Sequence, residues 1–89
     1  MNEAIAYHFW SQTCPPCNAI KPVIADLKEE FNTVQWISVD IKNDKQEYGK
    51  KFDVRFVPTV VVVGKNGQIG KHSGTAVAGY YRILRAGIV

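Results

Sequence analysis

The chain has 89 residues, the size of one domain, and we expect residues 1–89 to form a single unit around one core. Hydrophobic residues make up 46% of the sequence and charged residues 21%, which is typical of a globular protein and excludes disordered and collagen-like classes. The net charge is +3, but nucleic-acid binding would require more basic residues, interleaved with aromatic ones on one surface, so we expect no nucleic-acid partner.

No apolar run approaches the roughly 20 residues needed to cross a bilayer, so we expect no membrane partner. The N-terminal stretch MNEAIAYHFW lacks the basic, apolar and cleavage segments of a secretory signal. We therefore expect a cytoplasmic protein. In that reducing compartment, two cysteines close together are typical of redox chemistry or metal binding rather than of a structural disulfide.

The first half of the chain predicts a strand, a helix and a second strand. Residues 5–10 are apolar or aromatic on both alternating faces, which predicts a strand buried on both sides. A helix follows and ends at Asn32-Thr33, and residues 34–41 read as the second strand. The apolar stripe of the helix consists of Ile20, Val23, Ile24, Leu27 and Phe31.

The second half predicts a short helix, a hairpin and a last helix. Asn43 or Asp44 can cap a helix over residues 45–52. A β-branched strand over residues 57–64 is followed by Asn66-Gly67, a signal for a two-residue turn into an edge strand over residues 69–73. Thr75 can cap the last helix, whose apolar stripe is Val77, Tyr80, Tyr81 and Leu84.

The predicted order of elements is therefore β-α-β-α-β-β-α, an α/β fold. A helix joins the first two strands, so they are expected to be parallel with a right-handed crossover. The last two strands are expected to form an antiparallel hairpin. Together these elements predict a four-stranded mixed sheet flanked by three helices.

Cys14 and Cys17 are the two cysteines of the sequence, and they lie where the first strand passes into the first helix. Unpaired N–H groups and the helix dipole at this point favour a Cys14 thiolate. Cys17 lies one turn along the helix, where it can reach Cys14 and is less exposed. We therefore expect Cys14 to be the attacking thiol and Cys17 the resolving thiol of a redox site.

Two prolines separate the cysteines. Pro15 has the fixed φ that suits the first helical position, and Pro16 lies in the same turn. Neither has an N–H, so the Cys17 N–H remains as a donor to Cys14. We expect a lowered pKa for the Cys14 thiol, but not the lowest values that such sites reach.

Two other interpretations of the cysteine pair remain open. A structural zinc ion would need four ligands, and His8 and His72 could complete the set. These histidines lie in separate predicted strands and lack the paired spacing of zinc ligands. The second alternative is a pair of inert buried thiols, although prolines at a helix start favour an exposed turn.

Several motifs resemble the thioredoxin family over nearly all of the chain. The stretch FWSQTCPPC is similar to the family's Phe-Trp-x-x-Trp-Cys-Gly-Pro-Cys, and Pro22 matches the proline that kinks the active-site helix. VRFVPT is similar to the segment that carries the family's cis-proline, here Pro58. KNGQIGKHSG is similar to the family's hairpin, with Gly67 and Gly74 at its glycine positions. The family's first strand and helix have no counterpart in this sequence, so the resemblance implies a minimal thioredoxin fold.

The resemblance also implies a function. The chain would reduce protein disulfides through Cys14 and Cys17, beside a cis Val57–Pro58 bond. It would bind no cofactor or metal and would receive electrons from a thioredoxin reductase, indirectly from NADPH. We expect a monomer. The residues expected to bind substrate are Trp10, Thr13, Pro15, Pro16, Val57 and Gly74.

The sequence departs from the family at four positions. Thr13 and Pro15 replace a tryptophan and a glycine of the motif. His8 stands where the family has a buried aspartate beneath the second cysteine, and Trp36 stands where a lysine pairs with that aspartate. A neutral His8 imidazole could accept the proton of Cys17. The alternative is a packed histidine whose ring N–H bonds a backbone carbonyl.

Two alternative functions remain. A glutaredoxin-like, glutathione-dependent reductase would show Cys-Pro-Tyr-Cys and a Gly-Gly-Asp-like segment, and neither is present. A thioredoxin-fold binding module would hold a partner on the surface of Val57, Pro58 and Gly74 without turnover. The intact cysteine pair argues against the second alternative.

Overall fold

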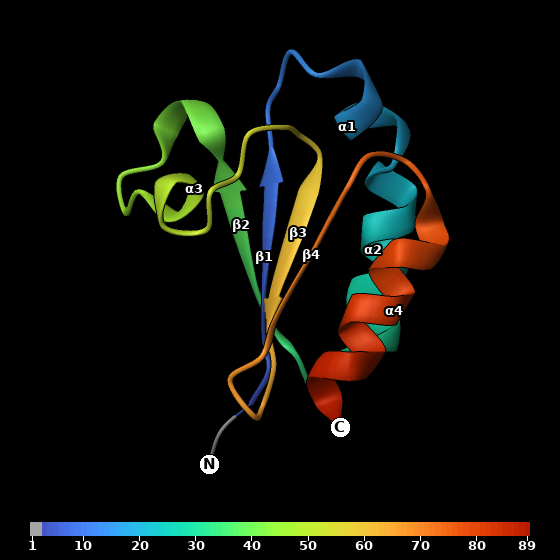
Figure 1. Ribbon diagram of the computed structural model, residues 1–89. Coiled ribbons are helices and arrows are strands. Elements are labelled where there is room, and N and C mark those ends of the chain that lie inside the picture. The colour runs from blue at the N-terminus through green and yellow to red at the C-terminus, as the bar shows by residue number, and fades with distance from the viewer. Residues whose placement is uncertain (1–2) are drawn as a thin grey trace.

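The computed structural model describes residues 3–89, so the expected domain start at Met1 lies outside the described residues. Within this range a four-stranded sheet in the order β2-β1-β3-β4 is covered by α2 and α4 on one face and by α3 on the other (Figure 1). The elements in chain order are β1 (Ile5–Trp10), α1 (Pro15–Ala19), α2 (Lys21–Glu30), β2 (Gln35–Asp40), the 3-10 helix η1 (Ile41–Asn43), α3 (Tyr48–Lys51), β3 (Thr59–Val63), β4 (Ile69–Ser73) and α4 (Val77–Ile88).

The sheet is mixed, as predicted. β1 pairs in parallel with β2, and the residue opposite His8 is Ser38. β3 pairs antiparallel with β1 on its other side, and β4 pairs antiparallel with β3 at the edge. The α/β fold with a four-stranded mixed sheet predicted from the sequence is therefore confirmed, with β1 and β3 as the central strands.

Alternate residues of the central strands face two separate cores. Ala6, Val60 and Val62 point toward α2 and α4, where they pack with Leu27 and Leu84. Both leucines are fully buried, and each stabilises the fold by about 1.5–3 kcal/mol relative to an exposed side chain.

The second core lies on the opposite face of the sheet. It consists of Tyr7, Phe9, Val39 and Val61, against which Tyr48 and Phe52 pack. The sheet is thus covered on both faces, as the apolar first strand predicts.

The helix expected after the cysteines is divided into α1 and α2, so residues 3–89 contain four α-helices where three were predicted. Ile20 lies between them with φ −96° and ψ 4°. In a continuous helix Pro22 could not donate an N–H to the Asn18 carbonyl, and its ring would clash with that carbonyl. The chain instead begins a new helix at Lys21, whose first turn accommodates Pro22.

Other boundaries also differ from expectation. α3 begins three residues later than predicted, yet both carboxylate oxygens of Asp44 accept bonds from its start, from the Tyr48 N–H at 3.0 Å and the Gly49 N–H at 2.8 Å. At the start of α4 the N-cap is Ala76, and no side chain of the described residues caps it, so the Thr75 cap is not found.

The hairpin between β3 and β4 has a longer turn than predicted. The Gly64 N–H donates to the Gln68 carbonyl, which leaves three residues in the loop. Gly67 has φ +86°, the left-handed conformation that closes a three-residue hairpin loop. Among residues 3–89, no helix is long and apolar enough to cross a membrane.

Candidate active site

The two cysteines meet at the start of α1. Cys14 is the N-cap residue, and Cys17 lies one turn into the helix. They form a disulfide with a Cα–Cα separation of 5.2 Å. The backbone N–H of Cys17 lies 3.1 Å from Cys14 Sγ and donates to it. Cys14 is 8% exposed and Cys17 is 3% exposed, so Cys14 is the more accessible residue of a largely buried pair.

The prolines leave one amide donor in the first turn. Pro15 and Pro16 occupy the first two positions of α1, and both side chains are exposed. Because neither has an N–H, the N–H of Cys17 is the donor that faces Cys14 Sγ, as predicted. The two exposed rings form part of the surface beside the disulfide.

The loop before β3 brings Val57 next to the disulfide. Its carbonyl oxygen lies 3.6 Å from Cys14 Sγ, and the Val57–Pro58 peptide bond is cis. The N–H of Gly74 donates to the Pro58 carbonyl at 2.9 Å, which brings the end of β4 to the same edge. The structure therefore brings together Cys14, Val57, Pro58 and Gly74 from segments far apart in the sequence.

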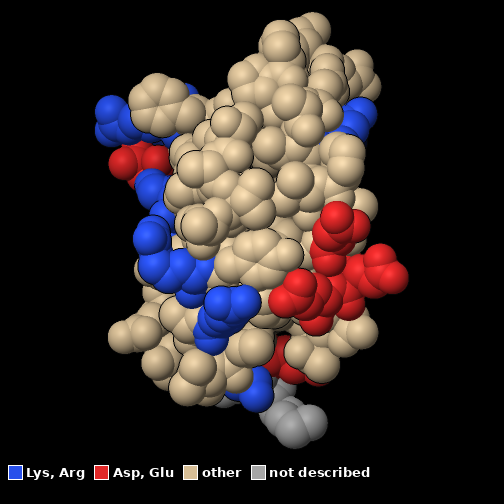
Figure 2. All heavy atoms as spheres, turned by 90° about the vertical axis from the view of Figure 1, so that its right-hand side faces the viewer, with Lys and Arg blue, Asp and Glu red and all other residues tan. Residues whose placement is uncertain are grey.

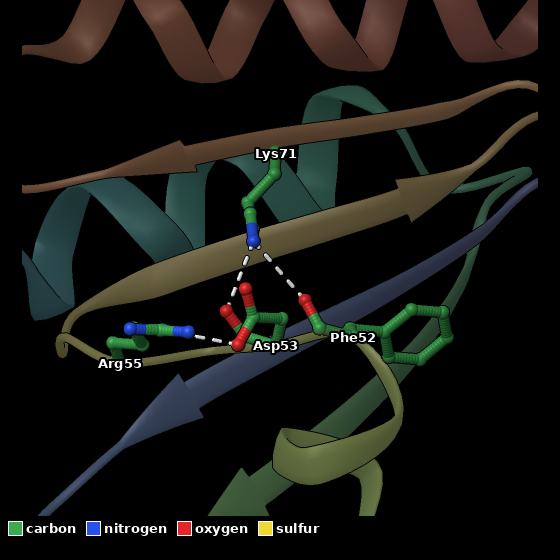
Figure 3. A network of polar contacts seen from close by, with 4 residues as sticks. All are labelled: Phe52, Asp53, Arg55 and Lys71. Atoms are coloured by element: carbon green, nitrogen blue, oxygen red, sulfur yellow. Dashed lines mark hydrogen bonds and ion pairs between the residues drawn. The ribbon is translucent and has the colours of Figure 1, made fainter.

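The segment that leads into this loop is anchored to β4. Lys71 Nζ donates to the carbonyls of Phe52 and Asp53, at 3.1 and 3.0 Å (Figure 3). The carboxylate of Asp53 accepts a bond from Arg55 Nε at 3.0 Å, which closes the turn. These contacts hold the backbone of residues 52–55, which leads into the loop of Val57 and Pro58. The position of that loop therefore depends on β4.

Two of the expected substrate-binding residues lie on the other side of the disulfide. Trp10 is half-buried, and its indole N–H donates to Ser38 Oγ at 2.7 Å. Thr13 is exposed, and its hydroxyl accepts a bond from Lys42 Nζ at 2.8 Å. Sequence reasoning missed Lys42, because its place in a basic stretch does not distinguish it from the neighbouring lysines.

His8 lines the same pocket as Cys17. It is 8% exposed, and its Nε2 has no hydrogen-bond partner among the described residues. Burial, followed by the positive charge of Lys28, lowers the pKa of His8 to about 4, so the imidazole is neutral near pH 7. A pocket of about 570 Å³ is lined by His8, Cys17, Trp10, Lys28 and Ser38, among others. His8 and Cys17, the two residues between which the sequence predicts a proton transfer, thus line the same pocket.

Trp36 does not take part in this site. Its indole N–H donates to the Phe31 carbonyl at 3.2 Å, and its ring packs against the core beneath α2 and α4. The basic group near His8 is instead Lys28, which sequence reasoning missed. Helical spacing alone does not show that Lys28 of α2 lies close enough to His8 of β1 to influence its pKa.

The zinc interpretation gains no support from the geometry. His8 lies on β1 and His72 on β4, and Val60 of β3 lies opposite both, between them. Within residues 3–89, no group of three or more histidine, cysteine, aspartate or glutamate side chains is placed to hold a metal ion.

The surface around the disulfide is mainly uncharged. Figure 2 shows the face covered by α2 and α4, where acidic side chains gather on one side and basic side chains on the other, while the end that carries α1 shows few charges. The exposed residues of this end include Pro15, Pro16, Thr75 and Ala76. This end of the described chain therefore presents mainly neutral groups to solvent.

The sheet order, the disulfide at the start of α1 and the proline loop beside it define a thioredoxin-fold protein. A family model described as thioredoxin matches residues 1–81. The thioredoxin of Oryctolagus cuniculus is 32% identical over 73 residues, which cover 82% of this chain and 69% of that protein. The chain belongs to the thioredoxin family.

Two further comparisons agree with this assignment. The chloroplastic F-type thioredoxin of Spinacia oleracea is 27% identical over 85 residues, or 96% of this chain and 43% of that protein. The X-ray structure of Fasciola hepatica thioredoxin has the same fold, with a TM-score of 0.85 at 24% identity, covering 98% of this chain and 83% of that one. The chain therefore spans between 43% and 69% of the length of the two curated relatives.

Proposed function

We propose that this chain is a thiol–disulfide oxidoreductase that reduces protein disulfides by dithiol exchange. The Cys14 thiolate attacks one sulfur of a substrate disulfide, forms a mixed disulfide and releases the first substrate thiol. The Cys17 thiolate then attacks Cys14 Sγ and releases the second substrate thiol. Two electrons pass from the dithiol to the substrate, and the chain is left with the Cys14–Cys17 disulfide. The observation that carries this proposal is that disulfide at the N-terminus of α1.

We further propose that His8 accepts the proton that Cys17 loses before the second step, directly or through one water. The shared pocket and the unpartnered Nε2 support this role. A pKa of about 4 keeps the imidazole neutral but makes it a weaker base than an exposed histidine. Its contribution is therefore expected at about tenfold, below the 10²–10⁴-fold of well-matched general bases.

The proposed substrate-binding surface surrounds Cys14. Its exposed part consists of Thr13, Pro15 and Pro16, and its other part is the backbone edge at Val57 and Gly74 beside Pro58. The half-buried side chain of Trp10 is the remaining member of this proposed surface. The disulfide of a protein substrate would approach Cys14 between these two parts.

The remaining parts of the proposal concern the setting of the reaction. The dithiol would be restored by a thioredoxin reductase or a similar donor, indirectly by NADPH, with no cofactor bound to this chain. We propose that residues 1–89 act as a single cytoplasmic domain and as a monomer, without nucleic-acid or membrane partners.

Turnover of a protein disulfide tests the function. Insulin reduction is followed with NADPH and thioredoxin reductase, and in parallel with NADPH, glutathione and glutathione reductase. We expect turnover with the first system and none with Cys14→Ser. Turnover only in the system with glutathione and glutathione reductase would support the glutaredoxin-like alternative. No turnover in either system would support a binding module.

A further inference from the structure

The hydroxyl of Tyr80 connects the core to the edge of the site. Tyr80 lies in α4 and is fully buried, and its hydroxyl donates to the carbonyl of Gly74. The N–H of Gly74 donates to the Pro58 carbonyl at 2.9 Å. Two hydrogen bonds in series thus lead from α4 to the loop whose Val57 carbonyl lies 3.6 Å from Cys14 Sγ.

The Gly74 segment depends on these bonds for its position. Gly74 has φ +95° and no side chain, and a Cβ added to it would meet no atom within 4 Å. The following helix α4, whose N-cap residue is Ala76, also has no side-chain cap from residues 3–89. Hydrogen bonds at Gly74, together with the Ser73–Thr59 hydroxyl pair at 2.6 Å beside it, therefore hold this segment.

His72 holds Tyr80 in place. The two rings pack edge to face, with centroids 4.5 Å apart and planes at 89°. His72 Nε2 lies 2.8 Å from the Ala76 carbonyl and donates to it, and the ring fills the space where a Cβ of Gly79 would lie. The absence of a side chain at Gly79 thus lets His72 reach Tyr80 and the start of α4 together.

The Tyr80 bond persists across the pH range in which thiols exchange. Burial raises the pKa of Tyr80 to about 12. The hydroxyl therefore keeps its proton and remains a donor to Gly74 well above neutral pH.

We infer that Tyr80 is a positioning residue for protein substrates: through Gly74, its hydroxyl sets the position of the Pro58 loop on which the substrate lies. This inference rests on the proposed function. A protein disulfide contacts the edge at Val57 and Gly74 as well as Cys14, so its binding depends on where that edge lies. A small disulfide contacts mainly the sulfur and is insensitive to it.

Tyr80→Phe tests the inference because it removes the hydroxyl and keeps the ring. One neutral hydrogen bond corresponds to roughly a three- to tenfold effect, so we expect KM for insulin to rise by that factor. The kcat for insulin should stay within about twofold, and so should the rate with the small disulfide DTNB. The Gly74 amide should exchange with deuterium faster in the variant, as measured by NMR.

Tyr81→Phe is the matched control on the same helix. The Tyr81 hydroxyl bonds Glu30 of α2 at 3.2 Å and does not contact Gly74. This variant should leave both rates and the Gly74 exchange unchanged. An equal loss with insulin and DTNB in Tyr80→Phe, an unchanged KM for insulin, or the same rise in Tyr81→Phe would overturn the inference.

Two further outcomes are covered by the same design. If the wild-type chain reduces no protein disulfide, the proposed function fails, and the Gly74 exchange alone decides the positioning role. Faster exchange in Tyr80→Phe supports that role, and unchanged exchange overturns it.

If Tyr80→Phe does not fold, His72→Gln replaces it, since loss of the His72 ring loosens Tyr80. In His72→Gln, a rise in KM for insulin smaller than the three- to tenfold expected of Tyr80→Phe, with an unchanged rate with DTNB, would support the inference. Wild-type kinetics with both substrates would overturn it.

Discussion

Protonation of His8 is expected to destabilise the fold in mild acid. The pKa of this side chain falls from its ordinary value of 6.5 to about 4 in the folded chain, chiefly because it is buried. Between these two pH values the unfolded chain binds more protons than the folded chain. The free energy of unfolding therefore decreases as the pH falls from 6.5 toward 4, whereas above 6.5 His8 is neutral in both states and has no such effect.

The size of the effect follows from the two pKa values. One pKa unit corresponds to about 1.4 kcal/mol, so protonation of His8 lowers the free energy of unfolding by about 2 kcal/mol at pH 5 and about 3 kcal/mol at pH 4. A typical domain has a total stability of only about 5–15 kcal/mol. His8→Phe abolishes this titration, while the carboxylates that also titrate in acid are the same in both proteins and cancel in the comparison.

Urea unfolding of the oxidised proteins at pH 7 and pH 5, followed by tryptophan fluorescence, measures the difference. On going from pH 7 to pH 5, the stability of His8→Phe relative to wild type should increase by about 2 kcal/mol. If the free-energy difference between wild type and His8→Phe is the same at both pH values, the reasoning from burial is refuted.

Three further predictions concern the reaction and the packing. Cys14→Ser should abolish disulfide reduction and Cys17→Ser should accumulate a mixed disulfide, seen by mass spectrometry; first labelling of Cys17 by iodoacetamide would reverse the roles. In stopped-flow kinetics, His8→Phe should slow release of the mixed disulfide by about tenfold and change attack by Cys14 much less; an unchanged release rate would make His8 only a core residue. Gly79→Ala should lower stability by about 1–3 kcal/mol in urea unfolding, because its Cβ would collide with the His72 ring; an unchanged midpoint would show that the ring moves away without cost.

The local pattern of the sequence was sufficient for the strands and for the chemistry of the cysteine pair. Alternation and β-branching locate the strands to within about two residues, because period two is a property of the extended chain itself. The position of Cys14 and Cys17 at a strand-to-helix junction, with Pro15 and Pro16 between them, also follows from local chain geometry. Motif resemblance added the neighbourhood of Pro58, which no spacing within the chain could indicate.

Turn and cap details were less predictable from the same local signals. Thr75 has the right chemistry for a cap, yet the N-cap residue of α4 is Ala76, whose carbonyl accepts a bond from His72. Asn66-Gly67 signals a turn, but three residues form the loop because Gly67 alone takes the left-handed conformation. At α4 a tertiary contact from His72, and in the hairpin the left-handed Gly67, selected one of several locally acceptable conformations.

The contacts that surround the site were decided only by the tertiary structure. Lys28 rather than Trp36 is the residue that influences His8, Lys42 bonds Thr13, and Tyr80 holds Gly74. Each of these pairs joins residues on different elements, so its formation depends on strand register, on helix packing and on side-chain rotamers. The sequence by itself determined which groups can exchange a disulfide, because thiol chemistry and helix geometry are local. The environment that orients those groups arises from long-range packing, which no short stretch of sequence contains.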